Sequence, residues 1–184
     1  MNQKGPTGLL EREHRVIQRV IGTMVTLAGT LERGGYVEVG TLIDTLEFMR
    51  AFADQCHHGK EERHLFPLLG RKGAPVTGYP LDALIRDHEN TRTLTRQLAG
   101  ASEAYLQGNL AAREALLESL RGLIGIYPNH MWKEDYLLFP MANRVLSPKQ
   151  QRDLRDKFEA VDAQIGTDAY QRFEQMANRL EGQG

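Results

Sequence analysis

Apolar residues recur every three or four positions along most of the chain, and no segment alternates apolar and polar residues as a strand does. This period is typical of amphipathic helices that bury one face. Glycines, prolines and polar clusters interrupt it at a few places and set the expected helix ends. Four long helices are predicted over about residues 8–33, 40–69, 80–108 and 109–146, with Gly34-Gly35 after the first, Pro80 in the first turn of the third and Asn109 as the cap of the fourth.

The C-terminal part begins with a strong helix-start signal. Ser147 is suited to the N-cap, Pro148 to the first helical position and Gln150 to the third. The helix that follows has an apolar face, which either the bundle or a second copy of the chain must cover. We therefore divide the chain into a bundle (residues 1–146) and a C-terminal helical extension (residues 147–184), which Gly166-Thr167-Asp168 splits into two helices.

The chain contains an internal repeat. Residues 57–67 and 130–140 carry His, Lys, Glu, Leu, Phe and Pro at the same offsets. Another inward-facing histidine lies upstream of each block, since His14 precedes His57 by 43 positions and His88 precedes His130 by 42. The repeat predicts two helical hairpins of one design, and hence an all-α fold built on an antiparallel up-down four-helix bundle.

The repeat spacing has a chemical rationale. Residues i and i+4 on a helix lie one above the other, so His57 with Glu61, and His130 with Glu134, can reach the same metal ion. Imidazole suits iron, copper and zinc, and a carboxylate can bridge two cations. Two buried carboxylates repel each other in a low-dielectric core unless cations lie between them. We therefore expect a metal site at the centre of the bundle.

This pattern resembles the hemerythrin family in its HHE cation-binding form, in a version with four histidines and two glutamates. The resemblance implies two iron ions joined by both glutamates and by an oxo or hydroxo bridge, with manganese or zinc as alternatives. It assigns His14 and His57 to one iron, and His88 and His130 to the other. The residues that carry it are His14, His57-x-x-x-Glu61 with Leu65-Phe66-Pro67, His88, and His130-x-x-x-Glu134 with Leu138-Phe139-Pro140.

One departure from the family pattern leaves the ligand set open. Oxygen-carrying hemerythrins have a further histidine one turn after the third-helix ligand, where this chain has Arg92. The symmetric set then leaves one open position on each iron. His64 is a candidate additional ligand, or a residue behind the ligands or on the surface. Tyr127, one turn before His130, is a second candidate that supplies a hydroxyl group or packs as an aromatic residue.

Other polar residues near the repeat have simpler interpretations. A register alternative, His58-x-x-x-Glu62, conflicts with the repeat, so His58 and Glu62 are expected at the rim or in solvent. Asp135 is the corresponding alternative to Glu134. Three acidic residues that flank ligands in sequence are expected to be solvated: Glu13, Asp87 and Glu89.

Composition narrows the function classes. The formal net charge of -1 gives no electrostatic argument for a nucleic-acid or membrane partner. A single cysteine, Cys56, excludes an internal disulfide and a Cys-rich metal site. No run of residues approaches the roughly 18 apolar positions of a membrane span, and no signal region follows the first residues. We therefore expect a cytoplasmic protein.

The functional hypothesis that follows is a non-haem di-iron protein that binds or reacts with O₂, peroxide or nitric oxide. Catalysis, including peroxide- or nitric-oxide-directed redox activity, is left open. The alternatives are iron delivery to damaged iron centres, their repair, or a role as an oxygen or iron sensor or store. A small diatomic or peroxide ligand is the expected partner, with a homodimer through the C-terminal helices as a further hypothesis.

Overall fold

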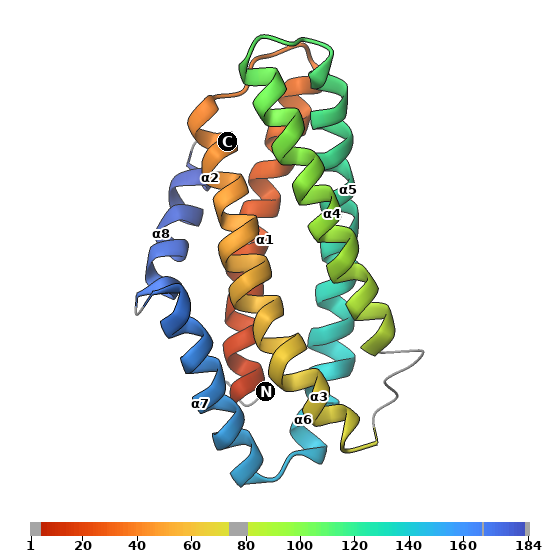
Figure 1. The fold of residues 1–184 in the computed structure, drawn as a ribbon, viewed down its shortest axis with the longest axis vertical. Coiled ribbons are helices and arrows are strands. Elements are labelled where there is room, and N and C mark those ends of the chain that lie inside the picture. Colours follow the sequence, from red (N-terminus) through yellow and green to blue (C-terminus); the bar gives the residue numbers. More distant parts are fainter. Residues whose placement is uncertain (1–4, 74–80, 167, 183–184) are drawn as a thin grey trace.

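The computed structural model describes residues 5–73, 81–166 and 168–182, and all regular structure in these ranges is helical. Four long helical segments run up and down beside one another (Figure 1). The all-α bundle expected from the sequence is therefore confirmed. Two residues with predicted roles at helix junctions, Pro80 and Thr167, lie outside the described ranges.

Two of the four segments contain stretches of π-helix, in which hydrogen bonds span five residues instead of four. The first and third segments are the continuous helices α1 (Pro6–Glu32) and α4 (Leu81–Leu106). The second consists of α2 (Val39–Glu47), the π-helices η1 (Phe48–His58) and η2 (Glu61–Leu65), and α3 (Phe66–Gly70). The fourth consists of α5 (Ala112–Lys133), the π-helix η3 (Glu134–Leu138) and α6 (Phe139–Val145).

The π-helices η2 and η3 lie at equivalent places in the repeat, each directly before a Phe-Pro pair. Pro67 and Pro140 have no N–H, and their rings crowd the carbonyl four residues earlier, which favours a wider preceding turn. Each wide turn shifts the buried face by one residue. Ordinary helical spacing would place Leu137 on the inner face, but it is 38% exposed, whereas Leu138 is 0% exposed.

Most helix ends follow their sequence signals. Gly34 has a positive φ of 84° just after α1, a conformation that glycine adopts at little cost. Ser147 forms the predicted capping box with Gln150. The predicted cap at Asn109 was wrong, because α5 begins later, after Ala111. The Asn109 side chain instead accepts a hydrogen bond from the Ala111 N–H at 3.0 Å, which stabilises the turn before the helix.

The C-terminal helices α7 (Pro148–Ile165) and α8 (Ala169–Glu181) pack along the outside of α1 and of the second segment (Figure 1). The ring centroid of Phe173 on α8 lies 5.9 Å from that of Phe48 and 5.4 Å from that of Phe52. These contacts join α8 to the apolar core of the bundle. The domain boundary at residue 146 and the homodimer stay predictions.

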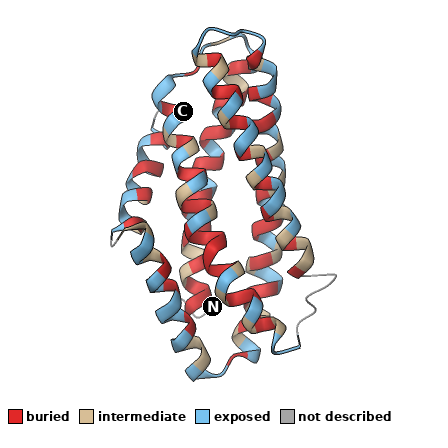
Figure 2. Ribbon diagram, in the orientation of Figure 1, coloured by how far each residue is buried: buried red, intermediate tan, exposed pale blue. Residues whose placement is uncertain are grey.

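A buried polar layer divides the interior. One apolar cluster occupies the half of the bundle that holds Met24 and Leu120, and another occupies the half that holds Leu10 and Phe139. Figure 2 shows buried positions along the inner faces of all four segments, without a break between the halves. The residues between the two clusters are histidines and glutamates, as buried as the core itself.

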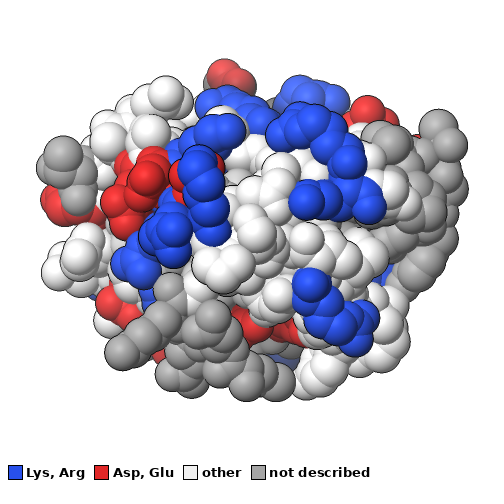
Figure 3. Space-filling model, turned by 90° about the horizontal axis from the view of Figure 1, so that it is seen from below, with Lys and Arg blue, Asp and Glu red and all other residues white. Residues whose placement is uncertain are grey.

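The formal net charge hides an uneven distribution. Lys and Arg side chains gather around an uncharged area on the end of the molecule seen in Figure 3. No helix in the described part of the chain combines the length and apolarity needed to cross a bilayer. The absence of a nucleic-acid or membrane partner stays a prediction.

Candidate metal centre

Six buried side chains converge between the two apolar clusters, and all four helical segments contribute. Glu61 and Glu134 are each 0% exposed and lie at the centre. Four imidazoles, each at most 1% exposed, surround them. The structure thus brings together the six residues singled out in the sequence: His14 on α1, His57 and Glu61 on the second segment, His88 on α4, and His130 and Glu134 on the fourth.

The donor atoms form two overlapping groups. In the first, Nε2 of His14 lies 3.2 Å from Oε2 of Glu134, and Nε2 of His57 lies 3.9 Å from Oε1 of Glu61. One donor atom from each of these four residues lies within 4.8 Å of the other three. This is a suitable cage for one cation.

The second group uses the same two glutamates. Nε2 of His88 lies 3.5 Å from Oε2 of Glu61, and Nε2 of His130 lies 3.2 Å from Oε2 of Glu134. Their donor atoms also lie within 4.8 Å of one another. Because both carboxylates belong to both groups, the arrangement suits two neighbouring cations with the glutamates between them.

Most donor atoms at the centre lack hydrogen-bond partners among the described residues, while Nε2 of His88 and Nε2 of His130 face each other at 3.2 Å. Neither oxygen of Glu61 or Glu134 has a hydrogen-bond partner, nor does Nε2 of His14 or His57. A buried polar atom left unsatisfied costs about 1–3 kcal/mol, and more if it is charged. Cations would satisfy these atoms and screen the two carboxylates from each other. The residues present therefore fit a metal centre with nitrogen and oxygen ligands.

In the first group, carboxylates hold the outer nitrogens of the imidazoles. Nδ1 of His14 lies 2.8 Å from Oδ1 of Asp135, and Nδ1 of His57 lies 2.9 Å from Oε2 of Glu13. A carboxylate accepts, so each Nδ1 donates and each Nε2 faces the centre with its lone pair. The expectation that Glu13 is solvated was wrong, since it is 3% exposed.

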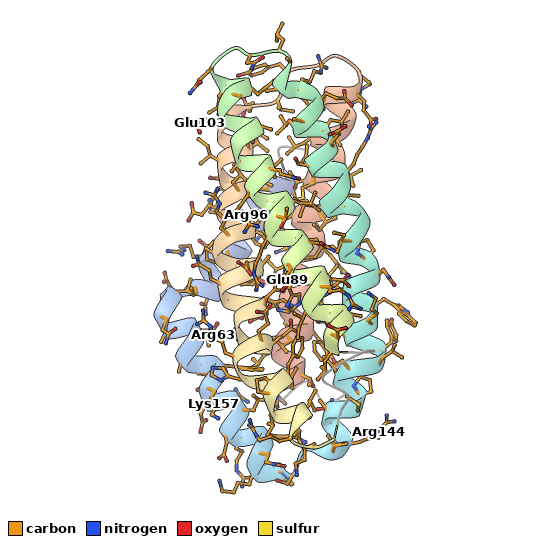
Figure 4. All side chains as sticks on the ribbon, turned by 45° about the vertical axis from the view of Figure 1, so that its right-hand side comes forward. Arg63, Glu89, Arg96, Glu103, Arg144 and Lys157 are labelled. Atoms are coloured by element: carbon orange, nitrogen blue, oxygen red, sulfur yellow. The ribbon has the colours of Figure 1, made fainter. Side chains whose placement is uncertain are left out.

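The second group repeats this arrangement. Glu62 accepts from Nδ1 of His88 at 2.6 Å, and a carboxylate oxygen of Asp87 lies 3.5 Å from Nδ1 of His130. Glu62, with 29% of its side chain exposed, lies at the rim as expected. Asp87 is 21% exposed and pairs with Lys133, so the expectation that it is solvated was wrong. Glu89, by contrast, is exposed on α4 as expected (Figure 4).

The repeated lysines support these carboxylates. Lys60 is 0% exposed and forms ion pairs with Glu13 and with Asp162 of α7. Its repeat partner Lys133 donates to Asp87 at 2.7 Å. The supporting residues thus obey the repeat: an acidic residue precedes each upstream histidine, and another follows each central glutamate. Comparison of the acidic positions in the two hairpins would have identified them.

Burial and neighbouring charges set the protonation of the metal-free site. Burial by itself lowers the pKa of His14, but the neighbouring carboxylates of Asp135 and Glu134 raise it to about 9. Burial and nearby histidines place the pKa of His57 and His88 well below the usual range.

The two central glutamates differ in protonation. Burial and the charge of Glu134 raise the pKa of Glu61 well above its usual value. Burial also acts to raise the pKa of Glu134, but His130 and His14 lower it overall. Of the two, Glu61 is therefore the carboxyl group that keeps a proton to higher pH before metal binds.

His58 is the residue that the sequence interpretation misplaced. It was expected at the rim or in solvent, yet it is 0% exposed. Its ring stacks on that of His88 at a centroid distance of 3.8 Å and an interplanar angle of 13°. The expectation assumed an ordinary α-helix, whereas η1 is a π-helix with more residues per turn, so His57 and His58 both face inward.

The two additional candidates lie at different places. His64 is half-buried and joins no group of possible metal donors among the described residues, because the wide turn of η2 gives the inner position to Leu65. Tyr127 is 1% exposed, with its ring centroid 6.3 Å from that of His130, and burial raises its pKa. Arg92 donates to Asp54 at 2.7 Å and to Glu62 at 2.6 Å.

Two small pockets approach the site between different pairs of segments. One, of about 190 Å³, lies between α1 and the fourth segment and is lined in part by His14 and Asp135. The other, of about 120 Å³, lies between the second segment and α4 and reaches Asp54 and Tyr127. Only the first reaches one of the six central residues.

Comparison with known proteins gives a consistent result. The family model described as the hemerythrin HHE cation binding domain matches residues 5–142. An uncharacterized protein of Mycobacterium bovis and one of Mycobacterium tuberculosis are each 26% identical over 151 residues. The matched region covers 82% of this chain and 58% of each relative, so the chain spans little more than half their length. No solved structure matches significantly.

Proposed function

The chain belongs to the hemerythrin HHE cation-binding family, and from this premise we propose that it holds two iron ions and reacts with a small oxidant such as O₂, peroxide or nitric oxide. The proposed ligands are His14, His57, His88 and His130, with Glu61 and Glu134 shared between the two ions.

A single observation supports this proposal most strongly. Glu61 and Glu134 are 0% exposed, and each belongs to both donor groups. Within the described part of the chain, none of their four oxygens has a hydrogen-bond partner. A tetrahedral zinc site has little use for two shared carboxylates. Mixed imidazole and carboxylate ligands suit iron, and manganese is the main chemical competitor.

The protein itself orients the imidazole rings and protects the site from bulk water. Asp135, Glu13 and Glu62 hold the outer nitrogens of three imidazoles, so the inner nitrogens of those rings present their lone pairs to the centre. Asp87 lies 3.5 Å from the outer nitrogen of the fourth, His130. The two apolar clusters exclude bulk water from both sides. Bound iron would supply the capacity to bind and reduce a small oxidant, which side chains alone lack.

The access route favours small reactants. The pocket beside His14 and Asp135 has a volume of about 190 Å³, enough for a diatomic molecule, peroxide or azide. Larger substrates would have to displace the helices that enclose the site. This restriction supports a small oxidant as the reactant.

The decisive test is the metal content of protein from iron-supplemented cells, together with its optical spectrum before and after azide is added. We expect about two irons per chain and near-ultraviolet bands that azide shifts. The matched variants are Glu61→Ala, which removes a shared ligand, and Glu89→Ala, which removes an exposed acidic residue. One zinc per chain, or no metal after anaerobic reconstitution with ferrous iron, would contradict the proposal.

A further inference from the structure

One carboxylate of the C-terminal extension reaches the residues that support the metal centre. Asp162 on α7 is 33% exposed, and its Oδ1 lies 2.5 Å from Nζ of Lys60, which is 0% exposed. The buried Cys56 thiol donates to the same oxygen at 3.0 Å. These contacts are possible because α7 packs against both α1 and the second segment (Figure 1). A side chain from outside the four segments therefore contacts two buried residues within them.

A chain of contacts leads from Asp162 to a proposed metal ligand. Lys60 also forms an ion pair with Oε1 of Glu13. The other oxygen of Glu13 accepts a hydrogen bond from Nδ1 of His57 at 2.9 Å. Lys60 and Glu13 are buried, so water and salt screen these interactions little. A change at Asp162 is therefore transmitted to His57 through two charged side chains.

The repeat provides an internal comparison. In the second hairpin, Lys133 and Asp87 stand in the places of Lys60 and Glu13, beside His130. Among the described residues, Lys133 pairs with Asp87 alone. There the carboxylate lies 3.5 Å from Nδ1 of the imidazole, and this nitrogen has no hydrogen-bond partner in the described ranges. The hydrogen bond to the imidazole is thus formed in the hairpin where two carboxylates share the lysine.

This contrast has an electrostatic reason. An ammonium group with a single carboxylate partner competes with every other donor for the lone pairs of that carboxylate. A second carboxylate on the ammonium group takes up part of its positive charge, so the first carboxylate accepts more strongly from the imidazole. A strong acceptor at the outer nitrogen fixes the ring and raises the basicity of the nitrogen that faces the metal.

We propose that Asp162 is a positioning residue of the metal centre: it shares the Lys60 ammonium group, and so leaves Glu13 to hold His57 in the orientation that binds a cation. This inference rests on the proposed two-metal function. It makes the C-terminal extension part of the centre although the extension supplies no ligand. Docking of α7 and tight metal binding are then coupled, and each favours the other.

The first test needs no metal. In the metal-free wild type, NMR of ¹⁵N-labelled histidine should show a slowly exchanging proton on Nδ1 of His57. Asp162→Asn changes the size of the side chain little but removes its charge, and should speed exchange of this proton at least about tenfold. Asp156→Asn, an exposed residue of the same helix, should leave the exchange rate unchanged. Equal exchange rates in Asp162→Asn and in the wild type would overturn the proposal.

The second test measures cobalt(II) affinity by competition with a chromophoric chelator. Asp162→Asn should weaken binding by about three- to tenfold, less than loss of a direct carboxylate partner of an imidazole. Asp162→Glu keeps the charge and should restore most of the affinity. Leu154→Ala removes a buried apolar contact of α7 but keeps the carboxylate, so it should lower the stability of the protein without this loss of affinity.

The third test determines whether Asp162 acts through Lys60. In a Lys60→Gln background, Asp162→Asn should cause no further loss of cobalt affinity, because the ammonium group that it shares is absent. A further loss of the same size would overturn the proposed route. Two cobalt ions bound to Asp162→Asn with wild-type affinity would overturn the role of Asp162 and leave the proposed function intact. Fewer than two cobalt ions bound to the wild type would overturn both.

Discussion

At the scale of single residues, the central feature is that each of four imidazoles has a carboxylate at its outer nitrogen. Such a partner fixes the tautomer and the ring orientation, and it raises the basicity of the nitrogen that faces the metal. Glu13 is buried and the other three carboxylates are partly buried, and Lys60, Arg92 and Lys133 form ion pairs with Glu13, Glu62 and Asp87. The site is therefore a connected network, not six independent side chains.

Replacement of one outer carboxylate should weaken metal binding without loss of the fold. We expect Asp135→Asn to reduce the affinity for the first cobalt by roughly 10- to 100-fold, because Nδ1 of His14 loses its charged acceptor. Competition with a chromophoric chelator measures the affinity. Glu89→Gln, an exposed acidic residue of α4, is the control and should bind as wild type. Equal affinities for the two variants would show that the Asp135 contact does not matter.

Proton release should make metal binding depend on pH. The pKa of His14 is raised to about 9 and that of Glu61 is also raised, so both lose protons when a cation binds. The apparent cobalt affinity should therefore increase with pH from about 6.5, the ordinary histidine pKa, to about 9.

The stability of the metal-free protein should change in the opposite direction. Because the folded-state pKa of His14 is raised, its stabilising contribution is complete below about pH 6.5 and is lost as the pH increases through about 9. Chemical denaturation at several pH values measures this. A flat stability profile and a flat affinity profile between these limits would contradict the assigned protonation.

The six central residues could be predicted from the sequence because the repeat presents each of these residue types twice, at matching positions. His58 and the outer carboxylates were missed for a common reason. Their positions were judged by the angular spacing of an ordinary α-helix, on which neighbouring residues point in different directions. In the structure, wide turns and contacts between hairpins bring them inward.

At the scale of elements, the Leu-Phe-Pro sequences explain the wide turns of the π-helices η2 and η3. Each proline disrupts the helical hydrogen-bond pattern just beyond a central glutamate, and the chain responds with one π-helical stretch. Periodicity predicted every long helix, but it could not reveal a shift of one residue within a helix. After Glu134, the neighbouring Leu137 and Leu138 are interchangeable by sequence alone.

The phase of the buried face can be tested with neighbouring leucines. Leu138→Ala should reduce the free energy of unfolding by about 2–5 kcal/mol, because this side chain is 0% exposed. Leu137→Ala, at 38% exposure, should cost less than about 1 kcal/mol. Urea denaturation of both variants gives the comparison. The reverse order would mean that the fourth segment is an ordinary α-helix through this region.

At the scale of the whole molecule, the C-terminal helices complete both the core and the charge network. Phe173 packs against two phenylalanines of the second segment, and Asp162 pairs with the buried Lys60 behind the site. The sequence predicted an apolar face that needs a cover but could not identify the cover. The structure shows that the bundle itself covers this face.

Loss of the α8 anchor should destabilise the whole protein. Phe173 is 0% exposed, so Phe173→Ala should cost about 3–5 kcal/mol and lower the thermal midpoint in a single transition. Tyr170→Ala, a partly buried neighbour on the same helix, should cost clearly less. Two separate transitions, with the bundle unchanged, would show that the extension folds on its own.

Because the proposed ligands come from all four segments, a bound ion would also act as a cross-link between distant parts of the chain. The helical segments that carry these ligands, from His14 to Glu134, would have to separate before both ions could leave. Metal exchange would then be governed by the rate at which the bundle opens, and not by the concentration of a competing chelator. A protein built this way would keep its metal for long periods even where the free ion is scarce, and would release it mainly when it unfolds.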